Sequence, residues 1–141
     1  MLTGMPLQIT FDCADPHVLA AFWAVALDYE VEDHHDRVEQ VIAAGHLTAD
    51  SDDVESVDGR LRFREFAACR SASTGDRLLF QVVPEAKTVK NRVHLDLHVE
   101  DRSAKLEQLY ALGATHLWDG QMGPQSWVTI ADPEGNELCV A

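Results

Sequence analysis

Polar and apolar residues alternate in two short segments that lie far apart in the chain, Gln8 to Cys13 and His94 to Val99. A period of two is typical of a β-strand that buries one face. Each segment is followed by a stretch in which apolar residues recur at three- and four-residue spacing, the pattern of a helix that packs one side on a sheet. We therefore predict helices from Pro16 to about Leu27 and from Arg102 to about Leu112.

Both predicted helices carry end signals where they are expected. Asp15 and Asp101 stand directly before them, and an aspartate there accepts hydrogen bonds from the free backbone amides of the first turn. Pro16 suits the first helical position, where no amide donor is missed. Gly113 offers the left-handed conformation that commonly ends a helix. The two segments therefore share one local design.

Further apolar runs predict the remaining strands. They are Arg37 to Ala43, Leu61 to Ala68 and Leu78 to Val83 in the first half, and Thr115 to Trp118, Trp127 to Ala131 and Glu137 to Val140 in the second. Each half then reads strand, helix, strand, strand, strand, and such repetition indicates two copies of one unit. We predict an α+β fold with two βαβββ modules in one domain, residues 7–84 and 92–141, joined by a linker at 85–91. A dimeric ferredoxin-like barrel is the alternative, and two helix-bearing repeats in one chain favour the first.

The charge of the chain is strongly acidic, with 24 Asp and Glu against 11 Lys and Arg and a formal net charge of −13. Such a field repels a phosphate backbone or an anionic lipid surface, so neither nucleic acid nor membrane is an expected partner. Much of the acidic charge falls between Asp28 and Asp58. We interpret residues 45–59 as an acidic surface loop inserted into the first module.

The three cysteines, Cys13, Cys69 and Cys139, show neither a disulfide framework nor a zinc-binding spacing. The longest uncharged apolar stretch is too short to span a bilayer. No basic residue precedes Arg37 to begin a signal peptide. We therefore expect reduced thiols and a cytoplasmic location.

Three segments together resemble a known superfamily. They are the strand from Arg92 to Asp101, the helix end from Leu112 to Ala114 and the closing hairpin from Ala131 to Val140. The chain resembles the vicinal oxygen chelate proteins, which include glyoxalase, the bleomycin-resistance proteins and the extradiol dioxygenases, and most of all their small glyoxalase-like members. The resemblance implies a cup-shaped sheet built from both modules and open to a small-molecule ligand. It also implies a homodimer, because such relatives often pair.

Metal-dependent members of the superfamily take their ligands from the first and last strand of each module. The matching positions here are Gln8, Gln81, His94 and Cys139. This set contains no carboxylate, whereas glyoxalase needs metal-bound carboxylates and extradiol dioxygenases need two histidines and a carboxylate on iron. Neutral amides are weak ligands for zinc, nickel or iron. We expect no metal or other cofactor, with a divalent metal as the alternative, and neither standard glyoxalase nor extradiol dioxygenase activity.

The same side chains suit a metal-free cup, because amides, an imidazole and a thiol can orient a polar group in an apolar site. The candidate ligand-binding residues are Gln8, Gln81, His94, His98, Trp118, Trp127 and Cys139. Other roles stay open for several of them: a structural hydrogen bond for His94, an exposed position for His98 and a space-filling thiol for Cys139. For the two tryptophans, a place in the core or in a dimer contact is an alternative of equal weight to a wall of the cup.

Proton transfer is the second chemistry that the strand faces allow. His94 shares one face with Asp96, and Asp12 holds the equivalent position in the first module. A carboxylate desolvated in the cup has a raised pKa and can act as a general base, so His94, Asp12 and Asp96 are the candidate catalytic residues. Exposed or ion-paired carboxylates are the alternative, and Glu137 is a weaker candidate of the same kind. Lys87, Lys90 and Arg92 form a basic cluster that either lies in solvent or attracts an anionic group.

Two functions follow from these observations. A non-catalytic protein that binds a partly apolar small molecule is favoured by the degenerate ligand set. The alternative is a lyase or isomerase that moves a proton next to a carbonyl through His94 and Asp12 or Asp96, with or without help from a metal. The sequence leaves open whether the protein is an enzyme, because this scaffold hosts binders and enzymes alike.

Overall fold

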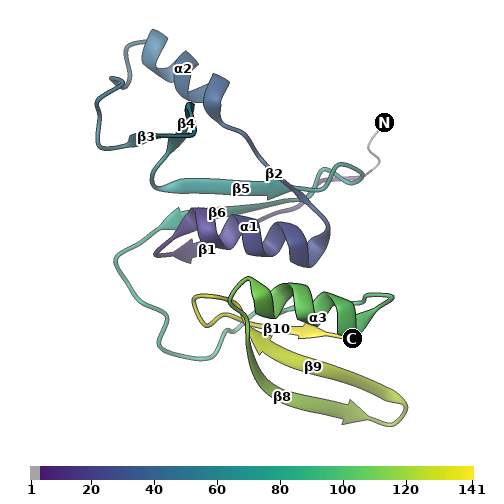
Figure 1. Cartoon of the computed structure of the whole chain (residues 1–141). Helices are drawn as coiled ribbons and strands as arrows, with labels where there is room; N and C mark the ends of the chain where they lie inside the picture. The colour runs from purple at the N-terminus through teal and green to yellow at the C-terminus, as the bar shows by residue number, and fades with distance from the viewer. Residues whose placement is uncertain (1–3) are drawn as a thin grey trace.

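Two four-stranded sheets, a separate hairpin and three helices make up the computed structural model, which describes residues 4–141 (Figure 1). The helices are α1 (Pro16–Leu27), α2 (His35–Ala43) and α3 (Arg102–Ala111). The first-module strands are β1 (Gln8–Cys13), β2 (Glu30–Val31), β3 (Val54–Val57), β4 (Arg60–Phe63), β5 (Phe66–Arg70) and β6 (Arg77–Val82). The second-module strands are β7 (Leu95–Leu97), β8 (Thr115–Met122), β9 (Gln125–Ala131) and β10 (Glu137–Val140).

The two sheets repeat one topology. The first has the order β1-β6-β5-β2 and the second the order β7-β10-β9-β8. In both, the first strand of the module runs parallel to the last, and the remaining neighbours are antiparallel. The predicted α+β fold of two βαβββ modules is confirmed. The predicted helix starts are confirmed as well, since Asp15 accepts from the amides of His17 and Val18, and Asp101 accepts from that of Ala104.

The predicted strand at Arg37 to Ala43 is wrong, because this segment forms the helix α2. Its apolar residues Val38, Val41 and Ile42 follow the three- and four-residue spacing of a helix, and Val38 is fully buried. The true second strand is the short β2, which pairs with β5. The predicted strand from Leu61 to Ala68 is likewise two strands, β4 and β5, which belong to different sheets.

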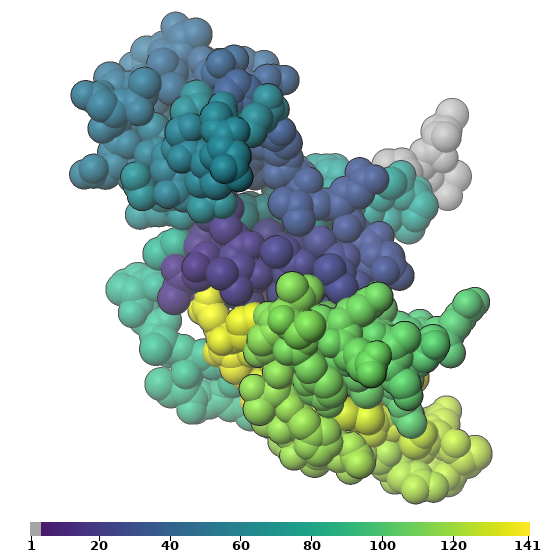
Figure 2. Space-filling model, in the orientation of Figure 1, coloured from purple at the N-terminus to yellow at the C-terminus, as the bar shows by residue number. Residues whose placement is uncertain are grey.

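The insertion in the first module is therefore a folded unit larger than the predicted acidic loop at 45–59. It comprises α2 and the antiparallel hairpin β3–β4, and it connects β2 to β5. Asp58 and Gly59 form the turn of that hairpin with positive φ. Arg60 forms an ion pair with Asp33, and Glu55 forms ion pairs with Arg62 of β4 and with Arg64, which follows that strand. In Figure 2 this unit, in blue and teal, stands apart from the green and yellow second module.

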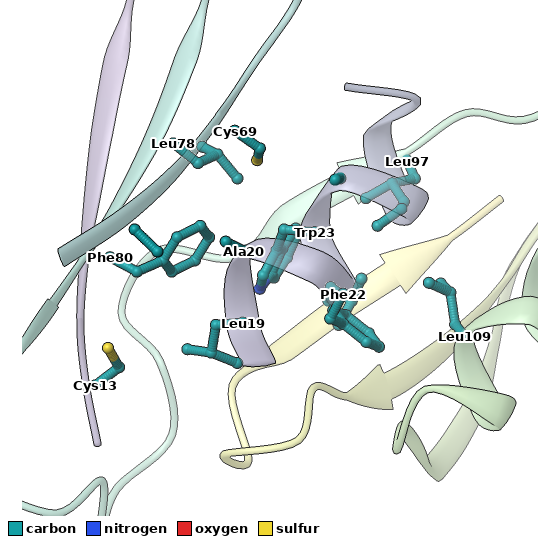
Figure 3. Packing of buried hydrophobic residues seen from close by; sticks show 14 of the residues in the cluster. Cys13, Leu19, Ala20, Phe22, Trp23, Cys69, Leu78, Phe80, Leu97 and Leu109 are labelled. Carbon is teal, nitrogen blue, oxygen red and sulfur yellow. The ribbon is translucent and has the colours of Figure 1, made fainter. Parts of the chain in front are cut away.

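A single hydrophobic core joins the two modules around α1. Phe80, Leu78 and Cys69 approach this helix from the first sheet, while Leu97 and Leu109 lie on its other side (Figure 3). The helix is consequently buried on nearly all sides, including Phe22 and Trp23. Each sheet directs its apolar residues to this core, so its alternate polar residues face away from the helices.

The β9–β10 turn fastens the second module to α1. Its Asp132 is buried, and its Oδ2 accepts a hydrogen bond from Trp23 Nε1 at 3.0 Å. Glu134 in the same turn accepts from the amides of Ala14 and Asp15 at 2.7 and 2.8 Å, just before α1 begins. The turn that resembled a family motif therefore has a structural task between the modules.

The other end of α1 is held in a similar way. Lys105 of α3 is largely buried, and its Nζ donates to the carbonyl of Val25 at 2.7 Å and pairs with Asp28 at 3.0 Å. A carboxylate at the start of a helix and an ammonium at its end both complement the helix dipole. No helix among residues 4–141 is long and apolar enough to cross a membrane.

Candidate functional site

The polar face of the second sheet gathers the strongest candidate residues. Asp96 of β7 lies beside Cys139 of β10, and Cys139 lies beside Thr129 of β9. His94 precedes β7 by one residue and points to the same face as Asp96. The inward residues Leu97, Leu138 and Ile130 alternate with this set and anchor the strands in the core.

His94 and Asp96 form a hydrogen-bonded pair. The distance from His94 Nδ1 to Asp96 Oδ1 is 2.9 Å. Because an ionised carboxylate only accepts hydrogen bonds, this contact assigns the imidazole proton to Nδ1 and leaves Nε2 of the neutral ring as an acceptor. The pair is thus suited to accept a hydrogen bond or a proton from a bound molecule at Nε2.

Cys139 is not an activated nucleophile in this environment. Burial raises the pKa of its thiol, although the contact with Thr129 Oγ1 at 3.3 Å acts in the opposite direction. A raised pKa keeps the sulfur protonated at neutral pH, whereas a nucleophilic cysteine needs a thiolate. The space-filling interpretation of Cys139 therefore agrees with the structure.

A cavity of about 510 Å³ opens above these residues. Its lining includes His94, Asp96, His98, Trp118, Trp127, Thr129, Cys139 and Lys90. A bulge in β8 between His116 and Trp118 places Trp118 opposite Thr129, on the cavity side of the sheet. Trp118 is 46% exposed, so a large part of its indole is available to a ligand.

The indole of Trp127 packs directly against Gly120. Gly120 of β8 pairs with Trp127 of β9, and a Cβ atom at position 120 would overlap the indole ring. The absence of a side chain lets the indole lie directly against the neighbouring strand. Trp127 thereby forms a fixed wall of the cavity.

The first-module candidates lie elsewhere. Asp12 accepts from Gln81 Nε2 at 2.9 Å, and Gln8 accepts from Arg77 Nη1 at 3.0 Å. None of Gln8, Asp12 and Gln81 lines the His94 cavity. Within the described chain, the four positions matched to family ligands therefore do not converge in one cup. Strand alternation predicts which face a residue occupies, but not how two modules are placed against each other.

A second cavity of about 560 Å³ separates β1 from β7. Its lining includes Asp12, Trp23, Leu95, Asn91 and Glu137. Glu137 also borders the His94 cavity, but its carboxylate accepts from the Asn91 amide at 2.9 Å and pairs with Lys87 at 3.2 Å. Burial opposes the charged form, yet these hydrogen bonds hold the pKa of Glu137 below its usual value. A carboxylate stabilised in this way is a poor general base.

Residues 8–141 match the family model described as the glyoxalase-like domain. The chain belongs to the glyoxalase-like domain family. A comparison with proteins of curated function returned no match. The resemblance inferred from the strand, the helix end and the closing hairpin is thereby confirmed.

Solved structures share the fold of this glyoxalase-like chain at low sequence identity. A glyoxalase/bleomycin resistance protein/dioxygenase family enzyme from Burkholderia phytofirmans is 13% identical, with 94% of each chain covered and a TM-score of 0.59. A fosfomycin resistance protein from Listeria monocytogenes, complexed with Mn(II) and 1S,2S-dihydroxypropylphosphonic acid, is 12% identical, with 99% and 90% covered and a TM-score of 0.60. A bleomycin-binding protein from Streptomyces verticillus, complexed with copper(II)-bleomycin, is 15% identical, with 100% and 98% covered and a TM-score of 0.51.

The metal bound by the fosfomycin resistance protein prompts a test of the donor atoms in this chain. One ligand atom each of His94, Asp96 and Cys139 lies within 4.8 Å of the others. Manganese(II) prefers oxygen ligands, whereas this set offers a thiol whose pKa is raised by burial. In addition, His94 Nδ1 and Asp96 Oδ1 are bound to each other. The residues do not fit the hard-metal site of that relative.

A second group of candidate metal ligands lies on α2 and comprises His35, Asp36 and Glu39. Here His35 Nδ1 accepts from the Leu61 amide at 2.9 Å, so the proton resides on Nε2, which is 3.2 Å from Glu39. Both ring nitrogens are therefore engaged: Nδ1 holds α2 to the hairpin, and Nε2 forms an i,i+4 contact within α2. The group has a structural explanation.

Sequence reasoning missed part of the cavity wall. Gln125, Ser126 and Thr129 line the cavity but were not among the predicted candidates. Residues two apart share a face of a strand, so the alternating pattern predicts that Gln125 and Thr129 lie on the same face as Trp127. That signal was lost for Gln125 because the predicted strand began at Trp127, whereas β9 begins at Gln125.

Proposed function

We propose that this glyoxalase-like protein binds a small, partly apolar molecule in the second-module cavity without a metal. The observation that carries the proposal is the combination of two tryptophan walls with the His94–Asp96 pair in one cavity of about 510 Å³. Ligand sites of proteins are mostly apolar hollows of this size with a few converging polar groups. The bleomycin-binding relative supports a binding role on this scaffold.

A thermal-shift screen of small molecules tests the proposal. Compounds that stabilise the wild-type protein are measured again on His94→Ala and Trp127→Leu, which remove a polar and an apolar lining residue. His116→Ala is the matched control, because His116 is exposed on β8 and lies outside the cavity lining. We expect the compounds to stabilise the control but not the two cavity variants. Hits that stabilise all proteins equally would contradict the proposed site.

Proton transfer next to a carbonyl is the second candidate function, and the His94–Asp96 hydrogen bond is the observation that favours it. The contact of Asp96 with Nδ1 leaves Nε2 as the proton acceptor of the ring, the arrangement of an oriented general base. If a bound compound is turned over, Asp96→Asn should lower kcat while leaving the dissociation constant of the compound nearly unchanged. An unchanged kcat would leave the His94–Asp96 pair with a binding role alone.

We further propose that the protein is a homodimer in which the polar face of one first module meets the second-module cavity of the other copy. Gln8, Asp12 and Gln81 form a polar face, and Phe66, which is paired with Gln81, is 42% exposed beside it. Asp12 does not line the His94 cavity of its own chain, and such an interface would bring it to that of the other copy. Light scattering during size-exclusion chromatography should give the mass of two chains. The Phe66→Asp variant should give the mass of one chain. A wild-type protein with the mass of one chain would exclude this arrangement.

A further inference from the structure

The chain contains eight glycines, and seven of them have positive φ. A positive φ by itself explains a glycine, because other residues adopt that conformation at a cost. Gly120 is the exception: it lies inside β8 with an ordinary φ, so its backbone would accept an alanine. Its lack of a side chain therefore has to be explained by what lies over it.

The indole of Trp127 lies over Gly120. A Cβ at Gly120 would overlap the six-membered ring edge and Nε1 of this tryptophan, so the ring rests against the backbone of β8. One side of the indole is thus covered by the strand, while Trp127 also lines the cavity. Gly120 is not needed for the turn at Gly123, which has its own positive-φ glycine.

We infer that the cavity takes a planar aromatic group stacked on Trp127, and that Gly120 is the specificity-determining residue that keeps the indole flat against β8. The inference rests on the proposed binding function and deepens it by naming the ligand class. Aromatic rings prefer offset stacking or edge-to-face contact, which a fixed indole wall provides. An indole pushed away from β8 would instead occupy the space of the ligand.

The test compares two acids of equal carbon skeleton by isothermal titration calorimetry. Naphthalene-2-carboxylate is planar, whereas decahydronaphthalene-2-carboxylate is saturated and thick. The wild-type protein should bind the planar acid about two- to ten-fold more tightly, the range that an aromatic pair adds beyond surface burial. Gly120→Ala and Trp127→Leu should each abolish this preference. His116→Ala, which alters an exposed residue of β8 outside the cavity lining, should retain it.

A double variant separates specificity from mere stability. If Gly120 acts through Trp127, Gly120→Ala should add no further loss of preference in the Trp127→Leu background, and the double variant should unfold at the temperature of Trp127→Leu alone. A full preference in Gly120→Ala would overturn the inference, as would equal or absent binding of the two acids to the wild-type protein. The proposed function would fail separately, if the compound screen gave no hit that depends on Trp127.

Discussion

At the scale of single residues, the environment of each side chain decides its chemistry more than its type does. Three thiols illustrate this. Burial raises the pKa of Cys13 and of Cys69 to about 12, and it raises the pKa of Cys139 as well. Two of these sulfurs are fully enclosed in the core, and only Cys139 borders a cavity. The cysteines therefore serve as small apolar side chains.

Alkylation with iodoacetamide tests this assignment. Because the thiol is protonated below its raised pKa, Cys139 should react slowly at neutral pH and faster only above the ordinary value of 9.0. Cys13 and Cys69 should react only after unfolding. Peptide mapping by mass spectrometry identifies the modified residue, with Cys139→Ser as the control. Rapid modification of Cys139 at neutral pH would show that it is a thiolate, and it would favour a role as a nucleophile.

Glu32 shows the opposite behaviour. Burial disfavours its charged form, but the hydrogen bond and charge of Arg77 outweigh this and lower the pKa of Glu32 below 4.5. A carboxyl group with a lower pKa in the folded state stabilises the fold above its unfolded pKa, and this contribution is lost as the pH falls through the folded value. Glu32→Gln should therefore reduce the free energy of unfolding at neutral pH and have a smaller effect in acid.

Urea unfolding at several pH values measures the effect of that change. Glu30→Gln is the matched control, because Glu30 is an exposed neighbour on β2. The account of the ion pair is wrong if both variants lose the same free energy, or if the loss at Glu32 grows as the pH is lowered.

At the scale of elements, the helices α1 and α3 and the end strands of each module were predictable, because capping and periodicity are local properties. The inserted unit of α2 and the β3–β4 hairpin was not predictable in this way. In α2 the apolar residues Val38, Val41 and Ile42 lie close enough together to resemble the apolar run of a strand, although their spacing is helical. The two-residue strand β2 is too short for any period to show, and it is defined only by its pairing with β5.

The helix α1 depends on side chains of the other module at both ends, which yields a prediction. Glu134→Gln removes the charged partner of the two amides just before the helix, and Lys105→Met removes the charged partner of the Val25 carbonyl near its end. Each should lower the free energy of unfolding by about 1–2 kcal/mol. Urea denaturation measures the change, with Glu107→Gln on the exposed side of α3 as the control. Losses no larger than that of the control would show that the ends of α1 need no such contacts.

At the scale of the whole molecule, one core joins two similar modules whose polar faces hold different residues. The second module has His94, Asp96 and two tryptophans around a cavity, whereas the first has hydrogen-bonded amides and carboxylates. The sequence pattern predicted the residues of both polar faces, but it also predicted that the two faces line one shared cup, which they do not. Strand alternation cannot predict that arrangement, since the position of one module against the other depends on the shared core around α1.

The most direct test of binding in the second-module cavity uses the three indole N–H signals in a nitrogen-15 NMR spectrum. Trp118 and Trp127 line the cavity, whereas Trp23 is buried and donates to Asp132. Single Trp→Phe variants assign the signals. On titration with a compound from the screen, the signals of Trp118 and Trp127 should shift while that of Trp23 stays in place. A compound that binds while those two signals remain unchanged would contradict the account.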